Sequence, residues 1–202
     1  VLPYDSVFSL CRKAGGRTAA ISYSWMSELY SRAPYISDRD RVQLDAEGSI
    51  QYGMYYWDDN YPDSHVFAEG ECLRKTFDPD FMLYHTMAVD EWGHMKGADS
   101  AEYANAVAAV GHLIAARMPE WLEKGYQVVV TADHGMNNLG IHVGTEHAQR
   151  EVALYIFSDK VENGRFEENY ISQLNVAPLV CKLMGVPATE GMKQELEIVF
   201  SK

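Results

Sequence analysis

Two short stretches of the chain place acidic and histidine side chains directly after apolar runs. Residues 89–94 read VDEWGH and contain Asp90 and His94, and residues 132–136 read ADHGM and contain Asp133 and His134. A further histidine, His142, lies eight residues after His134 in the stretch LGIHVGTEH. Carboxylate and imidazole groups without a nearby thiolate suit Zn²⁺ or another divalent first-row metal. These five residues are the candidate metal ligands.

The number of candidate ligands indicates what kind of site they form. Five protein ligands exceed what one catalytic zinc holds, because such an ion keeps a position open for water or substrate. Two ions roughly 3.5–4 Å apart stabilise the attacking and leaving oxygens in reactions at phosphorus. Gly93 and Gly135 accompany the two acid–histidine pairs, and we expect them to let the backbone turn sharply there. The pattern therefore predicts a two-metal site, with zinc as the expected ion.

Each motif taken alone has a plainer interpretation, because an acid near a histidine in a loop is commonly a salt bridge or a cap. His147 competes with His142 as the third imidazole. The other histidines are weaker candidates for metal ligands. His65 and His112 lie in helical patterns and are expected to be structural, and His85 lies in an expected strand as a core residue or a support for a ligand.

The elements around these residues have to bring them together. Apolar runs alternate with helical patterns, which predicts an α/β fold with a mostly parallel sheet flanked by helices. The expected strands are residues 17–23, 80–89, 126–132 and 152–157, and the expected helices are residues 5–16, 24–33, 65–77, 99–125 and 170–187. Asp90 and Asp133 each follow an expected strand, and ligands of such sheets bind at the carboxyl ends of the strands.

Three features qualify this outline. Asp99 and Glu102 have the spacing of a capping box at the start of the helix 99–125, and Pro119 should kink or divide that helix. Residues 34–63 lack periodicity and are expected to form an irregular excursion. The aromatic side chains at 52–57, together with Trp92, suit either packing or stacking on a nucleobase.

Composition limits the class of protein. The 202 residues are 47% hydrophobic and 23% charged, which is typical of a globular chain. A net charge of −12 argues against a nucleic acid duplex as partner, but a bound cation can still attract a small phosphorylated substrate. Three widely spaced cysteines are expected to be buried free thiols. The chain contains neither a signal peptide nor an apolar run of the ~20 residues that a membrane helix needs, so we expect a soluble domain.

The motifs together resemble the type I phosphodiesterase/nucleotide pyrophosphatase family of the alkaline phosphatase superfamily. DEWGH, DHGM and GIHVGT follow that family's order of a strand ending in D-x-x-G-H, a helix, a strand ending in D-H-G-M, and a histidine in a glycine-rich loop. GTEHAQREVALYIF, NVAPLVCKLMGVPATEGM and SVFSLCRKAGGRTAAI are similar to further segments of the family. The resemblance covers most of the chain except residues 34–63, and an ungapped comparison favours His142 over His147.

The resemblance implies a role for each ligand. One metal is held by Asp90, His94 and His142, and the other by Asp133, His134, an upstream Asp and a nucleophilic Thr or Ser. The last two residues are expected before residues 5–16, so the chain as given holds no catalytic nucleophile. We therefore expect residues 1–202 to be one alkaline phosphatase-like domain that lacks its N-terminal part, and to be inactive as an isolated fragment.

The expected activity of the parent protein is metal-dependent hydrolysis of phosphodiester or pyrophosphate bonds in a small phosphorylated substrate, a nucleotide being one candidate. Two alternatives stay open. One is another reaction of the superfamily, namely phosphate transfer or the hydrolysis of phosphomonoesters, phosphonates or sulfates. The other is a non-catalytic domain that binds metal.

Overall fold

The computed structural model describes residues 1–164, 170–192, 196 and 198–201, and it divides into two compact units. The first unit consists of Val1–Tyr56, Glu69–His85 and Ser158–Lys202, and the second consists of Trp57–Ala68 and Thr86–Phe157. Among the described residues, no helix is both long and apolar enough to cross a membrane.

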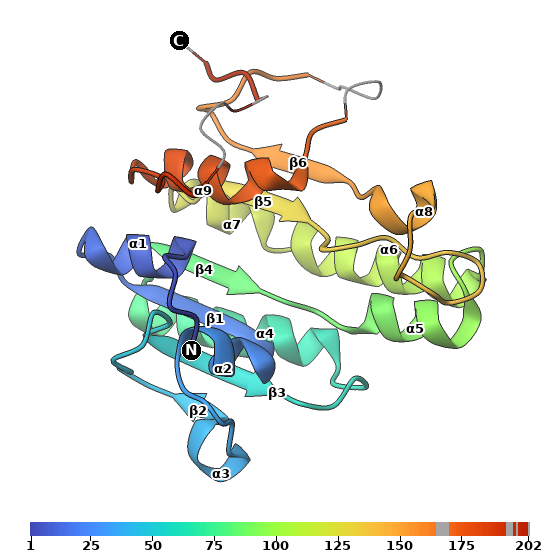
Figure 1. Ribbon diagram of the computed structural model, residues 1–202, viewed down its shortest axis with the longest axis horizontal. Coiled ribbons are helices and arrows are strands. Elements are labelled where there is room, and N and C mark those ends of the chain that lie inside the picture. The colour runs from blue at the N-terminus through green and yellow to red at the C-terminus, as the bar shows by residue number, and fades with distance from the viewer. Residues whose placement is uncertain (165–169, 193–195, 197, 202) are drawn as a thin grey trace. The chain divides into compact units, whose positions relative to one another are not determined.

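The first unit contains a four-stranded sheet in the order β2-β3-β1-β4 (Figure 1). Strand β1 (Thr18–Tyr23) pairs in parallel with β3 (Tyr52–Tyr56) and with β4 (Phe81–Tyr84), and β2 (Val42–Gln43) is antiparallel to β3. The helices of this unit are α1 (Val7–Lys13), α2 (Trp25–Tyr30), α3 (Ser37–Asp40), the later part of α4 (Asp63–Phe77) and α9 (Val176–Met184). A 3₁₀ turn, η1 (Gln173–Asn175), leads into α9.

Strand β1 is buried on both faces because helices cover the sheet from both sides. Ala20 belongs to a core cluster with Phe8 of α1, while its neighbour Ile21 points to the opposite face, towards Gly70 of α4. Figure 1 shows α1 and α4 on opposite sides of these strands. A strand enclosed in this way reads as a continuous apolar run rather than an alternating one.

The second unit contains the helices and loops that carry the candidate ligands. It consists of the start of α4, then α5 (Ala88–Lys96), α6 (Ala101–Ala115), α7 (Met118–Glu123), β5 (Val128–Thr131), α8 (His147–Arg150) and β6 (Leu154–Phe157). Strands β5 and β6 pair antiparallel, and the rings of Phe67 and Trp121 stack with their centroids 6.5 Å apart. Helices α6 and α7 divide just before Pro119, as the sequence predicts.

The predicted fold class is confirmed, because the chain is α/β and its four-stranded sheet is mostly parallel and flanked by helices. The predicted strand 80–89 is wrong in its second half: β4 ends at Tyr84, and α5 begins at Ala88. An apolar run by itself does not reveal where a strand gives way to a helix. Asp90 therefore lies inside a helix, and not at the end of a strand.

Three further differences concern local detail. Residues 34–63, expected to be irregular, contain α3, β2 and β3, where Tyr55 and Tyr56 are buried and Tyr52 stacks on Phe77. The cap of α6 is Ser100, whose hydroxyl accepts the N–H of Tyr103, and not the expected pair of acidic residues.

Of the three cysteines, Cys11 and Cys181 are buried as predicted but Cys72 is exposed. Burial raises the pKa of Cys11 to about 11.

The two-sided burial of β1 leads to a stability prediction. Ile21→Ala should lower the free energy of unfolding by about 2–5 kcal/mol, because the cavity left between sheet and helix cannot collapse fully. Ile36→Ala is the matched control, since this side chain is 48% exposed, and it should change the free energy by less than about 0.5 kcal/mol. Urea denaturation followed by circular dichroism measures both, and equal losses would contradict the description of the core.

Candidate metal centre

Helix α5 presents two of the candidate ligands on one side. Asp90 and His94 are four residues apart, which places their side chains next to each other on a helix surface. One carboxylate oxygen of Asp90 lies 3.4 Å from Nε2 of His94. At the start of α5, the carboxylate of the buried Asp63 accepts the backbone N–H groups of Met87 and Ala88 at 3.4 and 3.5 Å. Burial raises the pKa of Asp63, and these two N–H groups partly offset that effect.

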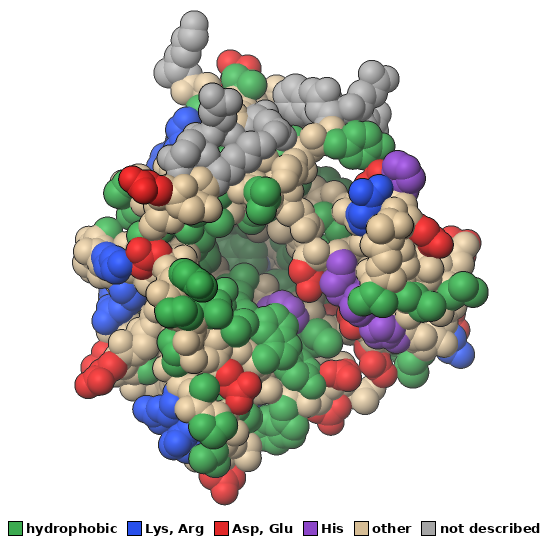
Figure 2. Space-filling model, viewed as in Figure 1, with side chains coloured by type: hydrophobic (Ala, Val, Ile, Leu, Met, Phe, Trp, Pro, Cys, Tyr) green, Lys and Arg blue, Asp and Glu red, His purple; other side chains and the backbone are tan. Residues whose placement is uncertain are grey.

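The segments after β5 bring two more histidines to the same carboxylate. The second oxygen of Asp90 lies 3.8 Å from Nε2 of His134. The ring of His142 stacks on that of His134, with centroids 3.8 Å apart, and its centroid lies 5.0 Å from that of His94. Ligand atoms of Asp90, His134 and His142 all lie within 4.8 Å of one another. In Figure 2, histidine and acidic side chains gather on the side of this face where α5 and α8 lie in Figure 1.

Backbone carbonyls determine which ring nitrogens of two histidines carry a proton. Nδ1 of His94 lies 2.8 Å from the carbonyl oxygen of Gly140, and Nδ1 of His134 lies 3.0 Å from that of Gly135. A carbonyl oxygen can only accept a hydrogen bond, so Nδ1 is the donor in both rings. In the neutral rings, Nε2 then carries a lone pair, and in both cases Nε2 is the atom that faces Asp90.

A carboxylate and imidazole nitrogens converge at the centre of this arrangement. Two lone pairs face a carboxylate, and the Asp90 oxygen nearer to His134 is buried without a hydrogen-bond donor among the described residues. A buried acceptor left unpaired is costly, and a divalent cation removes both problems at once. Ligand atoms around a tetrahedral zinc lie about 3.3 Å apart, close to the 3.4 Å between Asp90 and His94. The side chains present therefore fit a metal ion.

Asp133 occupies a different environment from the other candidates. Its side chain is 72% exposed, and one of its oxygens lies 3.7 Å from Nε2 of His134. Its other oxygen accepts the backbone N–H of His134 at 3.1 Å. The structure thus places Asp133 at the outer edge of the group, beside His134. The partition implied by the family resemblance pairs His134 with Asp133, whereas the tightest group in the structure pairs His134 with Asp90 and His142.

The remaining histidines lie outside this group. His147 begins α8 and pairs with Glu151, which leaves His142 as the third imidazole next to Asp90. His65 lies edge-on to Tyr61, and His85 lies edge-on to Trp25. Trp92, considered as a stacking platform, lines a small cavity of about 110 Å³ together with Tyr61 and residues 59, 60, 62, 88, 91 and 95.

The two motif glycines serve close packing rather than the sharp turns expected of them. Neither Gly93 nor Gly135 has a positive φ. A Cβ on Gly93 would lie 2.8 Å from the Met136 side chain and 3.2 Å from Tyr103, and a Cβ on Gly135 would lie 2.1 Å from the carbonyl oxygen of Ala148. Gly93 therefore lets α5 approach the residues that follow His134, and Gly135 lets that segment approach α8.

Two buried amides that shape the His142 loop were not found from the sequence. Asn137 accepts the N–H groups of Leu139 and Ile141, both at 3.0 Å, and Gln149 donates to the carbonyls of Ile141 and Val143, both at 3.2 Å. Asn137 and Gln149 are 8% and 5% exposed. No spacing rule marks these residues, because their partners are backbone groups of an irregular loop.

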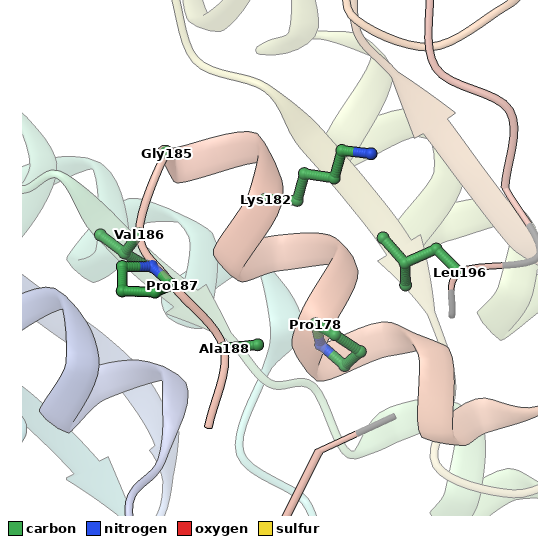
Figure 3. Close-up of a pocket in the computed structure, with 7 residues that line it drawn as sticks. All are labelled: Pro178, Lys182, Gly185, Val186, Pro187, Ala188 and Leu196. Carbon is green, nitrogen blue, oxygen red and sulfur yellow. The ribbon is translucent and has the colours of Figure 1, made fainter. Parts of the chain in front are cut away.

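A larger cavity in the first unit has no comparable chemistry. It measures about 470 Å³ and lies beside the C-terminal end of α9 (Figure 3). Its lining consists of Pro178, Lys182, Gly185, Val186, Pro187, Ala188 and Leu196. This lining includes neither an acid nor a histidine, so the Asp90 group is the candidate functional site.

Comparison with known proteins identifies the family of the chain. Residues 7–175 match the family model described as type I phosphodiesterase / nucleotide pyrophosphatase. The chain is 27% identical over 157 residues to the catalytic subunit of GPI ethanolamine phosphate transferase 3 of Mus musculus, which is 74% of this chain and 14% of that protein. It is 31% identical over 121 residues to the 2,3-bisphosphoglycerate-independent phosphoglycerate mutase of Wolinella succinogenes, covering 58% of this chain and 23% of that protein.

A solved structure of murine ectonucleotide pyrophosphatase / phosphodiesterase 5, an inactive form in complex with AMP, also shows similarity. It is 18% identical with a TM-score of 0.44, over 64% of this chain and 32% of that one. The chain spans less than a quarter of the length of the two curated relatives named above.

The convergence on Asp90 leads to a binding prediction. Zinc should bind the 202-residue chain, and Asp90→Ala or His94→Ala should weaken binding at least about tenfold, because each removes a group facing the central charge. His147→Ala should leave the affinity unchanged. Affinity should also fall as the pH is lowered, because protons compete with the metal for the proposed imidazole ligands. Titration calorimetry measures these constants, and unchanged affinity in both variants would refute the site.

The packing of Gly93 leads to a second prediction. Gly93→Ala should weaken zinc binding and destabilise the fold by about 1–3 kcal/mol, because its methyl group forces Met136 and Tyr103 away from α5. Gly111→Ala is the control, since a Cβ there meets no atom within 4 Å on α6, and it should stabilise the helix by up to about 1 kcal/mol. Thermal unfolding with and without zinc separates the two effects, and equal behaviour of the variants would contradict the packing argument.

Proposed function

Because the chain belongs to the type I phosphodiesterase/nucleotide pyrophosphatase family, we propose that it supplies most metal ligands of an enzyme that cleaves phosphodiester or pyrophosphate bonds. One observation carries the proposal beyond family membership. The carboxylate of Asp90 faces the unprotonated nitrogens of two imidazoles, and one of its buried oxygens has no donor among the described residues. That geometry calls for a cation, and metal ions are the usual electrophiles in phosphoryl chemistry.

The proposed site holds two divalent ions, with zinc as the metal of choice for a set of imidazole and carboxylate ligands. Asp90, His94 and His142 are the proposed ligands of one ion, and Asp133 and His134 are proposed for the other. The short distances between Asp90, His134 and His142 support a shared centre. The exposed carboxylate of Asp133 beside His134 supports a second position further out.

When bound, the ions supply Lewis acidity that polarises the phosphoryl oxygens and offsets their charge. The chain's own groups prepare the site for this. The carbonyls of Gly140 and Gly135 hold two imidazoles in the tautomer that offers Nε2 inward. Asp90 presents both of its oxygens to these imidazoles, so its charge is directed into the site rather than towards solvent.

The acidic character of the chain constrains the substrate. With a net charge of −12, the protein alone repels phosphate, so substrate affinity should depend on the bound cations. A small phosphorylated molecule, such as a nucleotide, is the proposed substrate class. The nucleophilic Thr or Ser and the remaining ligands stay a prediction for a segment preceding residue 1, within a single alkaline phosphatase-like domain.

Phosphate transfer to an alcohol is a second candidate reaction. The relatives include proteins named as an ethanolamine phosphate transferase and a phosphoglycerate mutase, whose names describe transfer or rearrangement of phosphate groups. Hydrolysis and transfer share the same metal-assisted attack and differ in whether water or an alcohol accepts the phosphoryl group. A product analysis therefore separates them.

The test uses bis(p-nitrophenyl) phosphate with zinc, in the presence and absence of glycerol. A protein that carries residues 1–202 with the predicted upstream segment should turn this substrate over, while the 202-residue chain alone should show little activity because the nucleophile is predicted to lie in that upstream segment. His142→Ala should lower kcat/KM by at least about 100-fold, and His147→Ala by less than about threefold. A glycerol phosphodiester formed without p-nitrophenyl phosphate, the hydrolysis product, would identify a transferase, because a hydrolase with a covalent intermediate forms both.

Three outcomes would overturn parts of this proposal. Zinc-dependent turnover by the isolated chain, abolished by Asp133→Asn, would place the nucleophile within residues 1–202. Equal losses in the two histidine variants would contradict the choice of His142. Zinc binding without turnover of any phosphoester by the longer protein would favour a non-catalytic metal-binding domain.

A further inference from the structure

We infer that Gln149 is a positioning residue that sets the spacing between the imidazoles of His134 and His142. This inference rests on the proposed metal site and extends it to a residue that touches neither the substrate nor the metal. Gln149 lies in the short helix α8, and its side chain is buried. Its backbone and its side chain bind the two segments that carry these histidines, which makes it the link between them.

The side chain of Gln149 holds the loop on both sides of His142. Its Nε2 donates to the carbonyl of Ile141 and to the carbonyl of Val143, each at 3.2 Å. Its Oε1 accepts the backbone N–H of Glu146 at 3.1 Å. A primary amide has two donor hydrogens, and both are used here on the two residues adjacent to the ligand. The direction in which His142 leaves the backbone is thereby constrained.

The backbone of Gln149 holds the other histidine segment. Its carbonyl accepts the N–H of Gly135 at 2.9 Å, directly after His134. The neighbouring carbonyl of Ala148 lies so close to Gly135 that a Cβ there would approach it to 2.1 Å. One residue therefore contacts the chain immediately after one imidazole and on both sides of the other, and the two rings stack 3.8 Å apart.

The apolar side chains of the loop do little to hold its shape. Leu139 and Val143 are 80% and 72% exposed, so burial of apolar surface contributes little to the conformation of residues 139–143. Hydrogen bonds to buried amides take over this task, from Gln149 on one side and Asn137 on the other. The carbonyl of Gly140, at the centre of the same loop, also accepts a hydrogen bond from Nδ1 of His94. A shift of the loop therefore disturbs more than one candidate ligand.

Gln149→Glu tests this role with a minimal change in shape. The carboxylate still accepts the N–H of Glu146 but cannot donate to the carbonyls of Ile141 and Val143. Zinc affinity of the 202-residue chain, measured by competition with a chromogenic chelator, should fall about 10–100-fold. Gln127→Glu makes the same chemical change at a half-buried position of the same unit, where the amide donates to the carbonyl of Gly125, and should leave affinity unchanged.

A double-mutant cycle with His142→Ala distinguishes positioning from general stability. If Gln149 acts through His142, Gln149→Glu should cost less affinity in the His142→Ala background than in the parent chain. The absorption spectrum of the Co²⁺-substituted chain adds an independent measurement, because Gln149→Glu and His142→Ala should alter the cobalt ligand-field bands in the same direction. Circular dichroism of the metal-free variants checks that both remain folded.

The outcomes separate this inference from the proposed function. Unchanged zinc affinity in Gln149→Glu, alongside a clear loss in His142→Ala, would overturn the inference and leave the metal site intact. Additive losses in the double variant would also overturn it, because they would mean that Gln149 acts independently of His142. Unchanged affinity in His142→Ala itself would overturn the proposed site.

Discussion

The candidate site depends on one electrostatic constraint, the carboxylate of Asp90 held against imidazole nitrogens that carry lone pairs. The distances from its oxygens to His94 and His134 are 3.4 and 3.8 Å, longer than charge-assisted hydrogen bonds. Negative charge and lone pairs placed this closely repel each other unless a cation lies between them. Burial next to the site also raises the pKa of Tyr103, and the charge of Asp90 adds to that shift.

The surrounding backbone maintains this arrangement. Carbonyl groups of Gly140 and Gly135 bind the outer nitrogens of the two rings, so rotation of either ring would lose a hydrogen bond. Gly93 brings α5 against Met136, and Gly135 approaches the carbonyl of Ala148. A side chain at either glycine would separate the segments that carry the ligands. The pattern of an acid, a glycine and a histidine is therefore a packing requirement as much as a set of ligands.

All five candidate ligands lie in the second compact unit, on one helix and on the segments that follow β5. This local origin has a mechanical consequence. The His142 loop exposes its apolar side chains, so its shape depends on a few buried polar groups rather than on a hydrophobic core. The loop keeps one shape while the buried amide side chains are hydrogen-bonded to it. Loss of any one of these side chains should therefore disturb that shape.

The sequence by itself determined the candidate ligands and the broad class of fold. Acids and histidines next to apolar runs indicated metal chemistry, and alternating patterns indicated an α/β chain with a mostly parallel sheet. Pro119 marked the break between α6 and α7 because proline cannot continue a helical ladder. These features are encoded locally, in residue type and spacing.

Only the tertiary structure decided how the ligands meet. The run before Asp90 contains a short strand and then a helix, which periodicity cannot separate, so Asp90 and His94 share a helix face instead of a strand end. The grouping of His134 with Asp90 and His142 depends on contacts between distant segments, whereas His147 pairs with Glu151 only four residues further along the chain. The partners of the Gln149 side chain are backbone groups, which every residue type presents. Its role therefore leaves no trace in residue spacing and becomes visible only when the chain is folded.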